Sequence, residues 1–307
     1  MNQPAPRQWP VLHYPAFIDT ITTVQLFTQI VGKIRLRMAP RLNHSWHVTL
    51  YVSARGLTTG SIPYAGGIFQ LKFDFIDHHL SITTSQGTGA LVSLSSQSVA
   101  SFYKELFAKL HSLGIQVQIY ACPNEVEPAI PFAQDEVHST YNKEQMHLYW
   151  QALVKVHSVF AQFRAGFAGK CSPVHLFWGA FDLAVTRFSG RPAPLHPGGV
   201  PNMPLRVMQE AYSHQVSSAG FWPGNTAFPQ PAFYAYCYPT PATFGLQEVT
   251  PAAAFYSTDM GEFFLPYDAV IRSHDPEGTL LQFLQSTYHA AAITGNWDDN
   301  LEFHFFE

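Results

Sequence analysis

Two kinds of hydrophobic periodicity follow each other twice along the chain, and this order constrains the fold most. Segments with apolar residues at helical spacing are predicted to be helices, and segments with alternating apolar and polar residues are predicted to be strands. The predicted helices are 20–38, 95–113, 142–167 and 275–292. The predicted strands are 46–55, 68–76, 80–84, 90–94, 115–120, 174–191, 209–218, 231–238, 261–267 and 301–306. We therefore predict an α+β protein of two tandem halves, each helix–four-strand–helix, with mainly antiparallel sheets.

The predicted boundary between the halves is rich in proline. We expect an N-terminal half over 1–120, a linker over 121–141 and a C-terminal half over 142–307 that carries the site. Weak echoes suggest a duplication: Gly-Lys recurs at 32–33 and 169–170, and a tryptophan precedes an arginine by nine residues at 46–55 and 178–187. The halves would pack sheet to sheet or edge to edge. Chance coincidence is the alternative.

Composition limits the classes of partner. Of 307 residues, 47% are hydrophobic and 12% are charged, about half the usual ~25%, which indicates a compact fold and favours a homo-oligomer. The net charge of −4 and the lack of a Lys/Arg run argue against nucleic acid. No apolar run approaches a membrane span. Three separate cysteines indicate reduced thiols in the cytoplasm.

Four ionisable residues stand in the apolar segment 174–191. Burying charge without a partner is costly, so His175, Asp182, Arg187 and Arg191 are candidate site residues. The two arginines flank Phe-Ser-Gly and form a candidate clamp for a substrate anion, because guanidinium groups bind carboxylate or phosphate in a bidentate manner. Alternatively, Arg187 forms a buried structural ion pair with Asp182 or Glu210.

His175 and Asp182 are a candidate general base and its orienting carboxylate. Their sequence positions place them on opposite faces of a regular strand, so a bulge near Gly179 would have to realign them. The alternative is that His175 only bonds the backbone. A second candidate pair, Glu210 and His214, has i, i+4 spacing and would share a face.

Glu210 and His214 also suit a metal site, with His175 or Glu262 as a third ligand, although the spacing fixes no third ligand. Glu262 is an acid in an apolar segment, and we expect it to pair with an Arg or His of 174–191. The Gly-Phe-Trp-Pro-Gly loop at 220–224 suggests a pocket wall made by Trp222 and Tyr267, with simple core packing as the alternative. Gly-x-Gly-x-x-Gly, the Walker motif and Gly-x-Ser-x-Gly are all absent.

Several segments resemble one protein family. Residues 43–59 (Asn-His-Ser-Trp-His-Val-Thr-Leu-Tyr-Val-Ser-Ala-Arg-Gly-Leu-Thr-Thr), 174–194, 212–224 and 286–288 look like a family of uncharacterised bacterial proteins catalogued as domain of unknown function 5996. The resemblance covers nearly the whole chain. It implies a soluble, full-length single unit, typically cytoplasmic, and it supplies no activity.

The residues alone therefore carry the functional prediction. They favour an enzyme without a cofactor, such as a lyase, isomerase or hydrolase, that acts on a small anionic, partly apolar metabolite by His/Glu/Asp acid–base chemistry. One alternative is a non-catalytic ligand-binding or structural protein with buried ion pairs. The other is a metal-dependent enzyme with His and Glu ligands. No motif identifies a cofactor.

Overall fold

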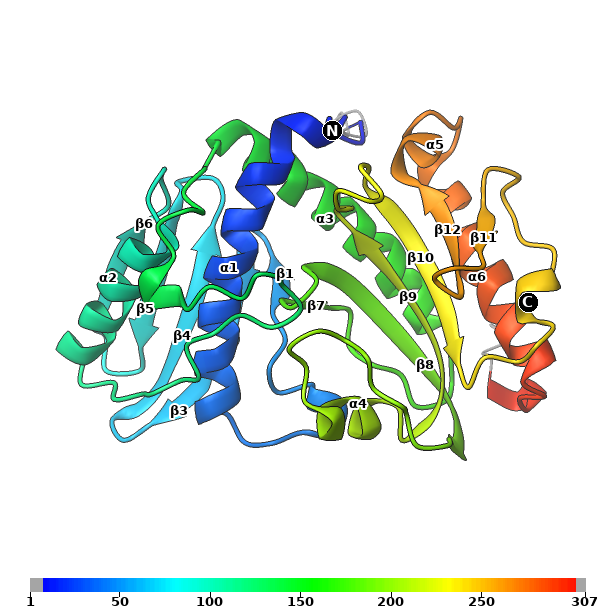
Figure 1. The fold of residues 1–307 in the computed structure, drawn as a ribbon, viewed down its shortest axis with the longest axis horizontal. Coiled ribbons are helices and arrows are strands. Elements are labelled where there is room, and N and C mark those ends of the chain that lie inside the picture. Colours follow the sequence, from blue (N-terminus) through cyan, green and yellow to red (C-terminus); the bar gives the residue numbers. More distant parts are fainter. Residues whose placement is uncertain (1–7, 302–307) are drawn as a thin grey trace, which may run out of the picture.

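Two six-stranded antiparallel sheets and the helices that cover them make up the fold (Figure 1), as a computed structural model describes it for residues 8–301. The α+β prediction is confirmed. The first sheet has the order β1-β2-β4-β5-β6, with β3 beside β4. Its strands are β1 (Tyr51–Ser53), β2 (Gly56–Thr58), β3 (Ile62–Tyr64), β4 (Gly67–Asp74), β5 (His79–Thr84) and β6 (Gly89–Ser93).

The second sheet has the order β11-β12-β10-β9-β8-β7. Its strands are β7 (His175–Phe177), β8 (Asp182–Pro192), β9 (His214–Trp222), β10 (Ala232–Tyr238), β11 (Phe255–Ser257) and β12 (Glu262–Pro266). The sheets meet at their edges, where Leu50, just before β1, bridges to Leu176 of β7 through hydrogen bonds of 2.9 and 2.7 Å. A single hydrophobic core extends through both halves.

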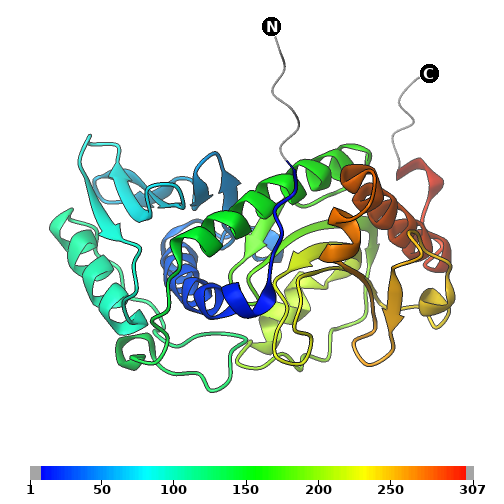
Figure 2. The ribbon, with the colours of Figure 1, turned by 90° about the horizontal axis from the view of Figure 1, so that it is seen from above.

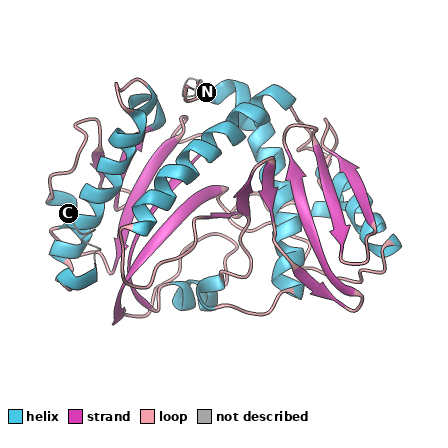
Figure 3. Cartoon of the chain, turned by 180° about the vertical axis from the view of Figure 1, so that it is seen from behind, coloured by secondary structure: helices cyan, strands magenta, loops and turns pink. Residues whose placement is uncertain are grey.

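Four long helices surround the sheets. They are α1 (Tyr14–Met38), α2 (Val99–Ser112), α3 (Lys143–Ala165) and α6 (Pro276–Thr294). The short helices are α4 (Leu205–Ala211), α5 (Tyr267–Ile271), η1 (Asn43–Ser45), η2 (Phe132–Gln134), η3 (Phe244–Leu246) and η4 (Asp299–Leu301). The view from above shows α1 between the two sheets (Figure 2). The view from behind shows α3 and α6 across one face of the second sheet, which leaves its other face to loops and α4 (Figure 3).

Local sequence explains most helix ends. Asn142 and Asp275 cap α3 and α6 by accepting hydrogen bonds from the backbone N–H of Gln145 (3.1 Å) and Gly278 (3.0 Å). The cap of α2 is Ser98 rather than Ser95 or Ser96. Helix α1 begins six residues before Thr20, because a proline occupies its first turn, where a missing N–H costs nothing. No described helix combines the length and apolar character that a membrane crossing needs.

The prediction for segment 174–191 differs most informatively from the structure. The segment is a hairpin rather than one strand, because residues 178–181 form a turn in which Phe181 has a φ of 59°. In the register of β7 and β8, Phe177 pairs with Asp182 and His175 with Ala184. Trp178 in the turn packs against Gly32 and donates a hydrogen bond to the Val48 carbonyl (2.8 Å). This contact ties the turn to α1.

Other strand predictions also change. Residues 115–120 form no strand, 46–55 contains only the three residues of β1, and 209–218 begins in α4. The strand predicted over 301–306 lies outside the described residues from 302 on. The paired tryptophans and arginines of the proposed repeat do not occupy equivalent positions: Arg55 follows β1, whereas Arg187 is central in β8. The division of the chain at 121–141 stays a prediction.

Candidate functional site

A cavity of about 920 Å³ lies on the face of the second sheet that α3 and α6 leave uncovered. Alternate residues of β8, including Asp182, Ala184 and Thr186, form its floor. Helix α4 and the loop before it cover the floor, and segment 122–125 closes one end. The loop is held to that segment where the Glu125 N–H donates to the Pro201 carbonyl (3.1 Å).

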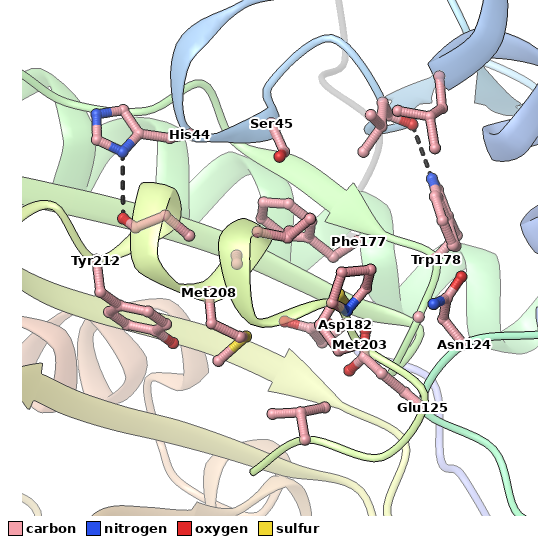
Figure 4. A pocket seen from close by; sticks show the side chains of 18 of the residues that line it. His44, Ser45, Asn124, Glu125, Phe177, Trp178, Asp182, Met203, Met208 and Tyr212 are labelled. Atoms are coloured by element: carbon pink, nitrogen blue, oxygen red, sulfur yellow. Dashed lines mark hydrogen bonds between the residues drawn. The ribbon is translucent and has the colours of Figure 1, made fainter. Parts of the chain in front are cut away.

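Two carboxyl groups line the cavity near each other. Asp182 is 8% exposed, and burial raises its pKa to about 6, although a hydrogen bond from the Tyr234 hydroxyl acts to lower it. Burial and the nearby charge of Asp182 raise the pKa of Glu125 to about 7. Figure 4 shows both acids on one side of the cavity, with His44 and Tyr212 on the other. Near neutral pH such a pair holds a proton that it can donate or take back.

Two glycines make room for this pair. Tyr234 on β10 reaches Asp182 on β8 by lying across β9 at Gly220, where any side chain would collide with the tyrosine ring. A side chain at Gly179 would collide with the Glu125 carboxylate. Among the described residues, none donates a hydrogen bond to that carboxylate, so it is available to a ligand.

A row of hydroxyl groups continues from Asp182 across the floor. The ring of Tyr234 stacks beside that of Tyr236 (centroids 6.1 Å apart), and the hydroxyls of Tyr236 and Tyr212 are 2.8 Å apart. Thr186 and Ser218 form another hydroxyl pair at 2.8 Å. These groups provide hydrogen bonds to a ligand in a cavity whose other walls are largely apolar.

Lys33 of α1 stands at the same end of the cavity as Glu125. Its ammonium group donates to the side-chain oxygen of Asn124 and lies 5.4 and 5.5 Å from the ring centroids of Tyr120 and Trp178. Burial lowers its pKa to about 8, while nearby Cys122 acts to raise it. A buried amine with this pKa is neutral in an appreciable fraction of molecules near pH 7.

A polar cluster fixes the far end of the cavity to α4. The backbone N–H of His44 donates to Glu210 (2.5 Å), and the ring of His44 contacts the Ala211 carbonyl (3.1 Å) and the Lys170 ammonium (2.8 Å). His44 has a φ of 55°. Burial and the Lys170 charge lower the pKa of His44. These contacts anchor the helix that covers the site.

The proposed arginine clamp does not form. Arg187 points to the face of β8 opposite the cavity, where it donates to the Phe163 carbonyl and lies 3.5 Å from the Phe163 ring centroid and 4.3 Å from that of Tyr288. The expected ion pair of Arg187 with Asp182 is therefore also wrong, because the two side chains are on opposite faces. A register shift after Phe188, with Gly190 at a φ of 84°, turns Arg191 toward Asp298 (3.2 Å).

Neither predicted pair of a histidine base and its orienting carboxylate is assembled. His175 is 1% exposed, and its Nδ1 lies 3.2 Å from the Thr49 hydroxyl. The hairpin register puts His175 on the same face of the sheet as Asp182, but His175 is opposite Ala184 and does not line the cavity. Burial lowers the pKa of His175 to about 3. Glu210 is on α4, whereas His214 is on β9 and contacts Ser213 (3.0 Å), so their spacing does not bring them together.

Glu262 forms no ion pair among the described residues, which contradicts its expected partner on 174–191. Burial and Asp182 raise its pKa to about 7, but it does not line the cavity. Trp222 stacks on Phe228, and Tyr267 packs in the core with its hydroxyl on the Pro10 carbonyl (2.8 Å). Neither aromatic residue walls the cavity.

No group of three or more His, Cys, Asp or Glu within 8–301 is placed to hold a metal ion. The alternative metal site made of Glu210, His214 and either His175 or Glu262 is therefore not assembled. Of the nine predicted site residues, Asp182 alone lines the cavity.

Sequence reasoning missed Lys33, Asn124 and Glu125. Lys33 carried a signal, since it is the one cation in the apolar run 30–34 of a predicted helix. Asn124 and Glu125 carried none, because they lie in a proline-rich linker whose position relative to the sheets depends on long-range packing.

Comparison with known proteins gives one match. No curated protein and no solved structure matches the chain. A protein-family model, described as a family of unknown function, matches residues 9–302. Because that match spans almost all of the sequence, the protein belongs to the family of unknown function DUF5996.

Proposed function

We propose that the protein is an enzyme that transfers protons on a small, largely apolar metabolite, with Asp182 and Glu125 as its acid–base pair. The observation that carries the proposal is the convergence of these two carboxyl groups, with pKa values raised to about 6 and 7, on one cavity of about 920 Å³. A general acid or base works best when its pKa lies near the operating pH.

The two carboxyls have different surroundings, which suits different roles. Asp182 is fixed by Tyr234 and is the first of the pair to ionise, so it is the proposed base. Glu125 has the higher pKa and is the proposed acid, since it keeps its proton to a higher pH. Because the charge of ionised Asp182 raises the pKa of Glu125, the two carboxyls lose their protons one after the other.

The lining suggests the kind of substrate. Phe177, Trp178, Phe188, Met203 and Met208 offer apolar walls, and the tyrosines offer hydrogen bonds. The anionic group expected of the substrate would be held by Arg206, an exposed residue of α4 that also lines the cavity, since neither Arg187 nor Arg191 does. The proposed chemistry uses no cofactor, and the three free cysteines fit a site of action in the cytoplasm.

A second candidate is a binding protein that holds the same kind of metabolite without changing it. The way in which α4 and the loop before it are held over the cavity favours this function. They are hydrogen-bonded at both ends, through Glu210 to His44 and through Pro201 to Glu125. A covered apolar cavity retains a ligand as well as it protects a reaction.

The deciding experiment incubates the purified protein with a defined metabolite mixture and follows each component by mass spectrometry. We expect one component to be consumed, and Asp182→Asn and Glu125→Gln to slow its consumption by about a hundredfold or more. Asp268→Asn, which changes an exposed acid paired with Arg272 (2.8 Å), is the matched control and should not slow it. Undiminished turnover in both cavity variants contradicts the proposal. Tight binding of a component without consumption supports the binding protein.

A further inference from the structure

We propose that Lys33 forms an imine with an aldehyde or ketone group of the ligand, so that the ligand of this cavity is a carbonyl compound. The inference rests on the proposed function insofar as the acid–base pair of that function would supply the proton for loss of water. It assigns to α1 a chemical role distinct from that of the two carboxyls.

The position of Lys33 is the first argument. The side chain lines the cavity, although the residue is only 4% exposed, so its amine is presented to a bound ligand and shielded from bulk water. Figure 4 shows its partner Asn124 beside Trp178 and Glu125, at the same end of the cavity. A carbonyl group bound there would lie near both the amine and a carboxyl group.

The lack of a counterion is the second argument. Across residues 8–301, no carboxylate lies within 4.0 Å of the Lys33 amine, whereas Lys155 pairs with Glu277 at 3.6 Å. The hydrogen-bond partner Asn124 carries no charge, and two rings with centroids 5.4 and 5.5 Å from the amine stabilise a cation only modestly. A lysine kept only for its charge would gain more from a carboxylate partner.

Protonation supports the geometry. Burial lowers the pKa of Lys33 to about 8, and at a pH near 7.5 its neutral fraction is roughly a hundredfold or more that of a lysine with the ordinary pKa of 10.5. Only the neutral amine has the lone pair that attacks a carbonyl carbon, and desolvation of an amine is one of the ways in which proteins activate it.

The step balances without an oxidant or reductant. The Nζ lone pair forms a bond to the carbonyl carbon, the carbonyl oxygen takes up a proton, and Nζ loses one, which gives a carbinolamine. A carboxylic acid, Glu125 in this arrangement, protonates the hydroxyl, which leaves as water while the nitrogen lone pair forms the C=N bond of an iminium ion. The iminium N–H then returns its proton to the Glu125 carboxylate, which leaves the neutral imine. One amine and one carbonyl thereby give one imine and one water, and hydrolysis reverses the step.

The test traps the imine in the full-length protein. The protein is incubated with benzaldehyde and cyanoborohydride, which reduces an imine to a stable secondary amine, and each lysine is quantified by peptide mapping. In the native protein we expect Lys33 to be labelled at least tenfold faster than Lys104, an exposed lysine of α2, and to lose this preference in urea. Equal labelling of the two lysines in the native protein overturns the inference.

Variants sharpen the result. Lys33→Arg should remove the fast phase of labelling of the whole protein, and Lys104→Arg should leave that fast phase unchanged. Because the wild-type map compares two lysines within one folded chain, the test stands even if Lys33→Arg does not fold. If a folded Lys33→Arg protein is still labelled as fast as the wild type, another group carries the label, and the inference is overturned.

The two proposals fail separately. If Lys33 is not preferentially trapped while turnover still depends on Asp182, the imine is wrong and the acid–base function stands. If Lys33 is trapped while Asp182→Asn and Glu125→Gln turn over the metabolite normally, the imine stands and the acid–base function is wrong.

Discussion

The first and second sheets each contain a buried aspartate, and the two have opposite surroundings. Asp74, at the end of β4, is 2% exposed and accepts hydrogen bonds from the Arg55 guanidinium and from the backbone N–H groups of Ile76 and Asp77, both at 3.0 Å. Burial acts to raise its pKa, but these donors outweigh burial, and its pKa is lowered. Asp182, on β8, has one tyrosine donor and a raised pKa.

The contrast separates a structural charge from a candidate functional one. Asp74 is held by donors that favour its ionised form, and it closes a turn and does not line the cavity. Asp182 faces open space next to another acid, with too few donors to keep it ionised at acidic pH. Burial alone therefore does not identify a functional acid. A candidate functional acid is recognised by the small number of hydrogen-bond donors to its carboxylate and by its access to a cavity.

The largest effect on stability should come from the protonation of Asp182. Its folded pKa of about 6 exceeds its ordinary value of 3.8, so its contribution to the free energy of unfolding is full below about pH 4 and is lost as the pH rises through 6. Asp182→Asn should therefore stabilise the protein by up to about 3 kcal/mol at pH 7 relative to pH 4.

The measurement is urea unfolding of variant and wild type across this pH range. The difference between the two curves is needed, because buried His175, with its pKa lowered to about 3, changes stability in the opposite direction below pH 6.5. A variant that is destabilised at pH 7 would place Asp182 in the same class as Asp74.

Asp74→Asn should have the opposite sign and a smaller size. Asparagine has one acceptor oxygen in place of two, so either Arg55 or the pair of backbone N–H groups of Ile76 and Asp77 loses its acceptor, and we expect destabilisation by about 1–3 kcal/mol at pH 7. The difference should shrink as the pH falls through the lowered folded pKa, since the wild-type carboxylate then loses its own charge. Turnover per folded molecule should not change, and a loss of turnover would remove the contrast.

Tyr234→Phe should affect Asp182 through one hydrogen bond. Because that bond favours the ionised carboxylate, its loss should raise the pKa of Asp182 by about one unit and destabilise the protein by about 1 kcal/mol at pH 7. Tyr236→Phe is the matched control, since the hydroxyl of Tyr236 bonds Tyr212 instead. Equal shifts in the two variants would show that the tyrosines act only by excluding water.

The smallest effect is expected at Arg191. Its ion pair with Asp298 is exposed, so Arg191→Ala should change the free energy of unfolding by less than about 1 kcal/mol. Ligand binding, measured by calorimetry with the metabolite that the protein consumes or retains, should be unchanged because Arg191 does not line the cavity. A large loss of affinity would reinstate the arginine clamp.

Long periodic segments could be predicted, and turns within apolar runs could not. The spacing over 142–167 and 275–292 gave α3 and α6, with caps at Asn142 and Asp275. The turn at 178–181 is hidden because Trp178, Ala180 and Phe181 are as apolar as a strand, and packing against Gly32 on α1 fixes the turn. Tertiary contacts of this kind leave no local pattern.

The same limit applies to the site. The scarcity of charge drew attention to Asp182, which lines the cavity, but it does not tell which face of a strand a charge occupies once a turn or bulge changes the register. The turn put His175 and Asp182 on one face of the sheet but set His175 opposite Ala184, and the register shift between Phe188 and Pro192 directed Arg191 to Asp298. Glu125 came from a segment whose position only the assembled fold determines.

The most direct test is a ¹³C NMR titration of the side-chain carboxyls in the wild-type protein, with Asp182→Asn and Glu125→Gln to assign the signals. We expect Asp182 and Glu125 to titrate near pH 6 and 7, in addition to Glu262 near pH 7, and we expect a lower pKa for Glu125 when Asp182 no longer carries a charge. Carboxyls at both positions that are fully ionised by pH 5, each unaffected by the other substitution, would contradict a shared proton in this cavity.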